Sequence, residues 1–124
     1  MKKERRILVV DDEPDNISVF SMGLEDEGFV VDTFTDPQLA LSAFKAGIYD
    51  LLILDIKMPI MNGFELYEKI KKIDNKLKVC FLTAFGEGYH EEFRSKFPSS
   101  SSDVNFVRKP IRIDELVKKV NDII

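Results

Sequence analysis

The sequence contains very few cysteine, histidine and tryptophan residues. Its 124 residues include one cysteine, Cys80, one histidine, His90, and no tryptophan. A single cysteine cannot form an internal disulfide, which suits a reducing compartment. Because Cys80 lies inside an apolar run, we interpret it as a small core residue. A chain of this length buries enough apolar surface to fold without disulfides or structural metals, so we expect one domain spanning residues 1–124.

Long hydrophobic stretches are also missing. The basic residues among positions 2–6 resemble the start of a signal peptide, but the apolar run that follows, 7–10, is far too short and meets two aspartates. No segment approaches the length that spans a membrane. We therefore expect a cytoplasmic protein with no membrane partner.

Positive charge is scarce relative to negative charge. The formal net charge is −4 and the sequence pI is about 5.1. Nucleic acids are bound through dense lysine and arginine surfaces, so the composition argues against direct nucleic acid binding by this domain.

Five short apolar runs alternate with helical patterns along the chain. The runs predict strands at residues 7–10, 29–34, 51–55, 79–83 and 104–107. Such alternation with short connections is typical of a parallel sheet covered by helices on both faces. The fold class we predict is α/β, a flavodoxin-like doubly wound (βα)5 sandwich with strand order 2-1-3-4-5.

Helix boundaries follow from proline and glycine positions. Pro14 and the Asp36-Pro37 pair start the first two helices, Gly28 and Gly47 end them, and a loop containing Asn62 and Gly63 precedes the third. The fourth helical region is irregular, with a short helix near 90–96 and a flexible serine tract at 99–102. We expect the following side chains on inward helix faces or in the core: Ile17, Phe20, Ser21, Leu24, Ala40, Ala43, Phe44, Leu66, Tyr67, Ile70, Ile73, Phe81, Phe97, Ile113, Leu116, Val117, Val120, Ile123 and Ile124.

Polar side chains occupy the carboxyl ends of the predicted strands. Asp11 and Asp12 follow the first strand, Asp55 ends the third, Thr83 ends the fourth and Lys109 follows the fifth. These ends share one edge of a parallel sheet, and strands 1 and 3 are neighbours in the predicted order. Crowded carboxylates need a cation or raised pKa values. Hard oxygen ligands without nearby histidine or cysteine favour Mg²⁺ over zinc.

An aspartate beside a divalent ion can act as a nucleophile toward phosphorus. It would become an acyl phosphate, with Thr83 and Lys109 contacting phosphoryl oxygens, because phosphoryl transfer depends mostly on alignment and charge neutralisation. Taken separately, each residue also has a structural interpretation. Asp11 and Asp12 could cap a helix, Asp55 could be a solvated strand end, Thr83 a strand residue and Lys109 a surface lysine.

Four motifs in order resemble those of the receiver domains of two-component response regulators, the CheY-like superfamily. They are Val9-Val10-Asp11-Asp12-Glu13, Leu54-Asp55-Ile56-Lys57-Met58-Pro59 with Asn62-Gly63, Leu82-Thr83-Ala84, and Val107-Arg108-Lys109-Pro110. The resemblance covers essentially the whole chain.

The resemblance implies a set of residue roles. Asp55 would be the phosphoacceptor, and Mg²⁺ or Mn²⁺ would be held by Asp12, Asp55 and the Lys57 backbone carbonyl directly and by Asp11 through water. The Thr83 hydroxyl would swing toward the phosphoryl group while Phe106 turns inward behind it, altering the helix 4/strand 5/helix 5 face. Ala84 suits the small residue beside the phosphoryl entry path.

The resemblance also implies partners. A sensor histidine kinase or phosphotransfer protein would supply the phosphoryl group, and an effector protein or fused output domain would respond to it. A phosphorylation-dependent homodimer is a further partner state of this kind. The domain would catalyse only its own phosphorylation and dephosphorylation.

Three features depart from the family pattern. The segment 97–103, Phe-Pro-Ser-Ser-Ser-Ser-Asp, replaces the usual small-residue pair before the fifth strand, and Phe106 lacks a tyrosine hydroxyl. Lys57 and Phe85 lie two residues after Asp55 and Thr83, and both are bulky. We predict that they obstruct the attacking water and lengthen the life of the acyl phosphate.

Two other functional classes and a non-phosphorylated scaffold are alternatives to a receiver domain. An aspartyl-nucleophile phosphatase typically has a second acid two residues after the nucleophile, where this chain has Lys57. A flavin or mononucleotide carrier is disfavoured by the first turn, residues 11–15, which has no glycine and bears four acids. A receiver-like scaffold that acts without phosphorylation remains an alternative.

Overall fold

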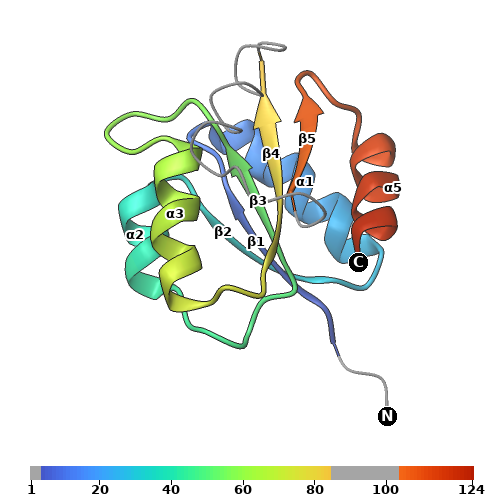
Figure 1. The fold of residues 1–124 in the computed structure, drawn as a ribbon. Helices are drawn as coiled ribbons and strands as arrows, with labels where there is room; N and C mark the ends of the chain where they lie inside the picture. Colours follow the sequence, from blue (N-terminus) through green and yellow to red (C-terminus); the bar gives the residue numbers. More distant parts are fainter. Residues whose placement is uncertain (1–3, 85–103) are drawn as a thin grey trace.

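The computed structural model describes residues 4–84 and 104–124. They include a five-stranded parallel sheet (Figure 1). The strand order is β2-β1-β3-β4-β5, so the predicted fold class and order 2-1-3-4-5 are confirmed. The strands are β1 (Arg6–Val10), β2 (Val30–Phe34), β3 (Leu51–Asp55), β4 (Lys78–Thr83) and β5 (Val104–Arg108).

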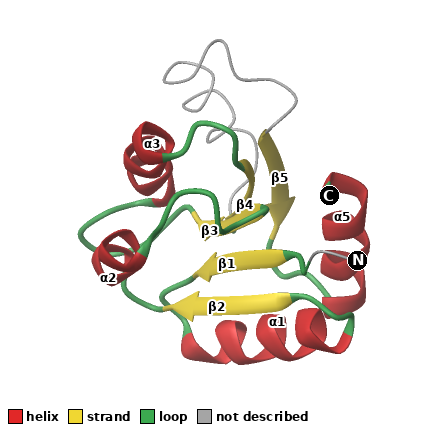
Figure 2. Cartoon of the chain, turned by 90° about the horizontal axis from the view of Figure 1, so that it is seen from below, coloured by secondary structure: helices red, strands yellow, loops and turns green. Residues whose placement is uncertain are grey.

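Helices cover both faces of the sheet (Figures 1 and 2). One layer holds α1 (Pro14–Asp26) and α5 (Ile113–Ile123), and the other holds α2 (Pro37–Ala43) and α3 (Gly63–Ile73). The core is accordingly divided into two clusters, one under each layer.

The central position of β3 in the sheet explains why residues 51–54 are all apolar. Leu52 and Leu54 belong to the cluster under α2 and α3, whereas Leu51 and Ile53 belong to the cluster under α1 and α5. All four are fully buried. A strand covered on both faces needs apolar residues at every position rather than at alternate ones, and each such side chain stabilises the fold by about 1.5–3 kcal/mol.

Several helix boundaries are those expected. Pro14 is the first residue of α1, and Gly28 adopts a φ of 93° just after that helix, a conformation glycine takes without steric cost. The Asp36 side chain accepts a hydrogen bond from the Gln38 N–H at the start of α2. Asn62 and Glu65 form a reciprocal capping box at the start of α3.

Two expectations about helix faces are wrong. The second helix ends at Ala43 rather than near Gly47; Ala43 is exposed, and Phe44 reaches the core from extended backbone beyond the helix. Ile73, the last residue of α3, is 50% exposed rather than on the buried face of the helix.

The aromatic and cysteine predictions can be compared with burial. Phe20, Phe44, Phe81 and Cys80 are all buried, as expected. The predicted fourth helix near 90–96, the serine tract at 99–102, Phe85, His90 and Phe97 lie outside the described residues. In the parts of the chain that the structure describes, no helix is long and apolar enough to cross a membrane.

Candidate metal centre

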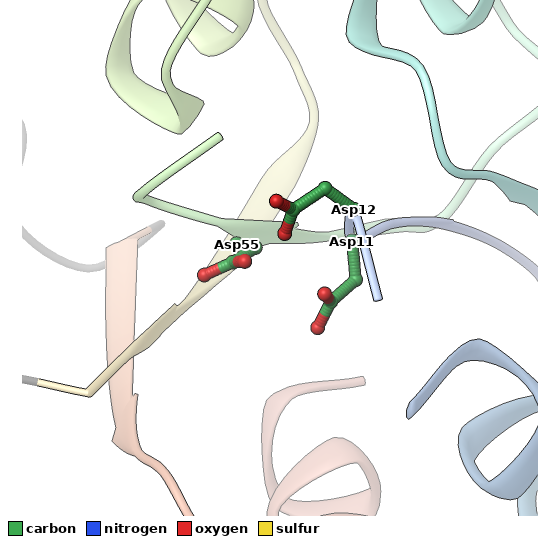
Figure 3. A group of neighbouring side chains, drawn as sticks. All are labelled: Asp11, Asp12 and Asp55. Carbon is green, nitrogen blue, oxygen red and sulfur yellow. The ribbon is translucent and has the colours of Figure 1, made fainter. Parts of the chain in front are cut away.

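Three aspartates meet where β1 and β3 end. Each of Asp11, Asp12 and Asp55 offers a carboxylate oxygen, and these atoms lie within 4.8 Å of one another (Figure 3). Asp11 is fully buried and Asp55 is 5% exposed, while Asp12 is the most exposed of the three. The parallel register pairs Val10 with Leu54, so the residues that follow each come side by side. The sequence prediction that these acids converge is therefore confirmed as geometry.

The start of α3 packs directly against the backbone that carries Asp55. The Gly63 N–H donates a hydrogen bond to the Ile56 carbonyl at 2.8 Å. A Cβ at Gly63 would collide with the Asp55 carbonyl oxygen and come within 3.0 Å of the Ile56 Cα. Only glycine allows this approach, so Gly63 fixes the peptide on which Asp55 is mounted.

Asp11 is held by contacts on both carboxylate oxygens. Its Oδ1 accepts a hydrogen bond from the Glu13 N–H at 2.9 Å, and its Oδ2 accepts one from Asn16 Nδ2 at 3.4 Å. The residue at the N-cap of α1 is Glu13, and it makes no side-chain cap bond. Simple helix capping thus does not explain why the first turn carries adjacent aspartates.

Lys109 supplies the positive charge of the cluster. Its Nζ lies 3.0 Å from Asp11 Oδ2, 3.3 Å from Asp55 Oδ2 and 3.7 Å from Glu13 Oε1. Its backbone N–H donates to the Thr83 carbonyl at 2.7 Å, which ties the end of β5 to the end of β4. Lys109 is therefore a partly buried counter-charge rather than a surface lysine.

The electrostatics of the cluster make the Asp55 carboxyl group harder to ionise than an ordinary aspartate. Burial is the largest cause and repulsion from Asp11 the second, and together they raise the pKa of Asp55 to about 7 despite the opposing effect of Lys109. Burial lowers the pKa of Lys109, but its hydrogen bond to Asp11 and its attraction to Asp55 outweigh burial, so the net shift is upward.

A hollow of about 470 Å³ opens over the cluster. Its walls are formed by Asp12, Glu13, Asp55, Lys57, Met58, Pro59, Ala84 and Lys109. Lys57 and Ala84 therefore line the same hollow as Asp55. Thr83 is buried at the end of β4 and does not line the hollow. Phe106 packs outside it, with its ring centroid 5.5 Å from that of Phe81.

The donor set fits a hard divalent cation. Carboxylate oxygens are the ligands that Mg²⁺ and Mn²⁺ prefer, and the cluster contains neither the histidine nor the cysteine that zinc favours. Two functional features had no assigned role in the sequence: Glu13 as a wall of the hollow and Gly63 as the support of Asp55. Glu13 lies in the motif Val9-Val10-Asp11-Asp12-Glu13, and Gly63 lies in the Asn62-Gly63 pair that follows Asp55; membership of these motifs is the sequence signal that could have pointed to them.

Comparison with known proteins gives a consistent family. The family model for the response regulator receiver domain matches residues 7–121. The transcriptional regulatory protein TcrA of Mycobacterium tuberculosis is 32% identical over 115 residues, which are 93% of this chain and 44% of TcrA. The response regulator SaeR of Staphylococcus aureus is 30% identical over 118 residues, 95% of this chain and 50% of SaeR. The chain thus spans about half the length of these relatives.

Solved structures show the same fold. The chemotaxis protein CheY4 of Vibrio cholerae superposes with a TM-score of 0.85 at 25% identity, covering 98% of this chain and all of that one. The response regulator TrrA of Thermotoga maritima, solved in complex with Mg²⁺ and beryllofluoride, has a TM-score of 0.77 at 38% identity, covering 97% and 99% of the two chains. By family match, fold and acidic cluster together, this chain belongs to the response regulator receiver domain family.

Proposed function

We propose that residues 1–124 form one receiver domain in which Asp55 accepts a phosphoryl group from a phosphohistidine in a Mg²⁺-dependent reaction. Receiver domains are signalling switches of two-component systems rather than conventional enzymes. The observation that supports the assignment to Asp55 is its position: it is buried between two further carboxylates and Lys109, with one side open to the hollow.

The chemistry follows from this placement. An Asp55 carboxylate oxygen attacks phosphorus, a new O–P bond forms, and the P–N bond to the histidine breaks with its electron pair going to the imidazole, which then takes up a proton. Lys109 stays paired with Asp11 and neutralises a phosphoryl oxygen when Asp55 is phosphorylated. The divalent cation, when bound, supplies the charge neutralisation that lets an anionic phosphoryl group approach the carboxylates.

The proposed ligands of the cation are residues of the same edge. Asp12, Asp55 and the Lys57 backbone carbonyl would hold it directly, and Asp11 would hold it through water. Asp11 suits the indirect role because it is fully buried and already engaged by Lys109 and the Glu13 N–H. Asp12, the most exposed of the three, suits direct contact from the open side.

The proposed switch joins the site to the far side of β5. The Thr83 hydroxyl would move toward the phosphoryl group, and Phe106 would turn inward behind it and alter the helix 4/strand 5/helix 5 face. Phe106 on β5 is half-buried, pairs with Phe81 on β4 in the sheet register, and has its ring centroid 5.5 Å from that of Phe81. Inward rotation would bury more of its ring. Such rotation needs no hydroxyl, because burial of the ring supplies the driving force.

Lys57 supports a proposal about signal lifetime. It lines the hollow beside Asp55, where a water attacking the acyl phosphate would approach. Replacing Lys57 and Phe85 together with alanine is expected to speed dephosphorylation, measured as loss of the phosphorylated mass over time. An unchanged rate would sink this proposal and leave the phosphoacceptor assignment intact.

The partners proposed are those of the family. A sensor histidine kinase or phosphotransfer protein is the donor, and an effector protein, a fused output domain or a second phosphorylated copy is the reader. These are cytoplasmic partners, so we propose the same compartment for this domain. The acidic charge of the domain leaves any nucleic acid binding to another part of a regulator.

The test is intact-mass measurement after treatment with acetyl phosphate and Mg²⁺. The wild-type chain is expected to gain one phosphoryl group and Asp55→Ala none. Continuous release of phosphate in large excess over protein would indicate a phosphatase instead. No gain of mass in the wild type would indicate a scaffold that acts without phosphorylation.

A further inference from the structure

A second hollow lies at the opposite end of the sheet from the aspartate cluster, and we name it the basal hollow. It has a volume of about 850 Å³ and is formed by the segments that lead into β3 and β4, the end of α3, the residue before β1 and Ile124. It shares no lining residue with the hollow over Asp55. A concave space of this size is in the range that holds small molecules.

Basic side chains outnumber acidic ones in the lining of the basal hollow. Its acidic side chains are Asp50 and Asp74, against five cationic ones, which leaves three positive side-chain charges in excess; the cations are Arg5, Lys71, Lys72, Lys76 and Lys78. The whole chain has a net charge of −4. The basal hollow therefore concentrates positive charge against the overall trend.

The two carboxylates are already engaged by the backbone. Asp50 Oδ2 accepts a hydrogen bond from the Arg6 N–H at 2.9 Å. Asp74 accepts one from the Gly47 N–H at 3.0 Å and another from the Lys76 N–H at 3.1 Å. Their roles are to fix the loops that shape the hollow.

Three of the cationic side chains of the basal hollow form no ion pair within the described residues. Within residues 4–84 and 104–124, Arg5, Lys72 and Lys76 form no ion pair. Lys72 lies in the last turn of α3, where a cation also offsets the partial negative charge of the helix end. That partial charge amounts to about half an elementary charge, so it does not cancel the excess.

From this charge and shape we infer that the basal hollow binds a soluble compound carrying two or more linked phosphate groups. Lysine acts as a point charge toward phosphate, and the cations come from three separate segments. Cations on three separate segments can each contact a different phosphate of a linked pair or triplet, which favours such a ligand over a single phosphate. The site is independent of Asp55 and stands or falls apart from the proposed phosphoryl transfer.

The test is a titration of the whole chain with inorganic triphosphate in EDTA, followed through backbone amide NMR signals. Saturable one-to-one binding is expected, with the largest changes at Gly47 and Lys76. The variant Lys72→Gln/Lys76→Gln, which alters two exposed side chains, is expected to bind about tenfold more weakly or worse. The control Lys69→Gln/Lys118→Gln makes the same change of charge at exposed positions outside the hollow and is expected to bind like wild type.

Three outcomes would overturn the inference. The first is an equal loss of affinity in both double variants, which would reflect net charge alone. The second is signal changes confined to Asp55, Thr83 and Lys109, which would place the anion in the other hollow. The third is equally tight binding of an acidic peptide of matched charge, which would show that the hollow does not select phosphate.

Discussion

Replacing Asp55 with asparagine is expected to stabilise the metal-free protein above neutral pH. The pKa of Asp55 is raised from 3.8 to about 7 in the folded chain, mainly by burial and then by Asp11. A raised pKa means that folding favours the protonated acid. Protonated Asp55 therefore makes its full contribution to the stability of the folded chain below pH 3.8, and this contribution is lost as the pH rises through about 7. Asparagine stays neutral and does not lose it.

The magnitude follows from the size of the shift. One pKa unit corresponds to about 1.4 kcal/mol, so the shift from 3.8 to about 7 bounds the effect near 4 kcal/mol. We compare the free energy of unfolding of Asp55→Asn with that of wild type at two pH values. The difference, variant minus wild type, is expected to be about 2–4 kcal/mol larger at pH 8 than at pH 4. Mg²⁺ should reduce the difference in free energy of unfolding between Asp55→Asn and wild type at pH 8, because binding of the ion stabilises the wild-type folded state.

The assay is urea unfolding in EDTA at a series of pH values, followed by circular dichroism. Asp122→Asn, an exposed aspartate on α5, is the matched control and should follow the wild-type curve. Parallel curves for wild type and Asp55→Asn between pH 4 and 8 would refute the reasoning that burial and Asp11 disfavour the Asp55 carboxylate.

Three further substitutions test other parts of the structure. Gly63→Ala should lower the free energy of unfolding by about 1–3 kcal/mol, because its Cβ would press on the Asp55 carbonyl. Ile60→Gly should raise it by about 0.5–1 kcal/mol, because Ile60 has a φ of 72° and is 83% exposed, so left-handed strain is relieved without loss of buried surface. Tyr49→Phe should lower it by about 0.5–1.5 kcal/mol through loss of the 2.8 Å hydrogen bond from its hydroxyl to Asp32.

Each of these is measured by urea unfolding and has a contrary result. A Gly63→Ala variant as stable as wild type would mean that α3 shifts freely away from β3. Destabilisation by Ile60→Gly would mean that the exposed side chain contributes packing energy. An unchanged Tyr49→Phe variant would mean that Asp32 is satisfied by Arg6 alone, which contacts it at 2.9 Å.

Strand positions and the acidic edge were predictable because parallel topology imposes them. Once β1 and β3 are neighbours, Asp11 and Asp55 must meet, whatever the details of the helices. The buried strands were also readable, since a run such as 51–54 has no polar side that could face water. These features depend on pattern and on handedness, both of which are present in the sequence.

Other features depend on contacts that the pattern does not contain. The early end of α2 at Ala43 leaves Phe44 to reach the core from extended backbone, a choice made by tertiary packing rather than by helix spacing. The support of Asp55 by Gly63 depends on a close backbone approach. The basal hollow joins residues far apart in the chain, so no local motif announces it.

The central claim is that Asp55 itself carries the phosphoryl group. It is tested by treating the chain with acetyl phosphate and Mg²⁺, reducing the acyl phosphate to an alcohol with borohydride, and mapping the peptides by mass spectrometry. We expect a single reduced residue, at position 55, and expect no reduced residue in EDTA or in Asp55→Asn. Reduction at Asp11, Asp12 or any other carboxylate, or none at all, would contradict it.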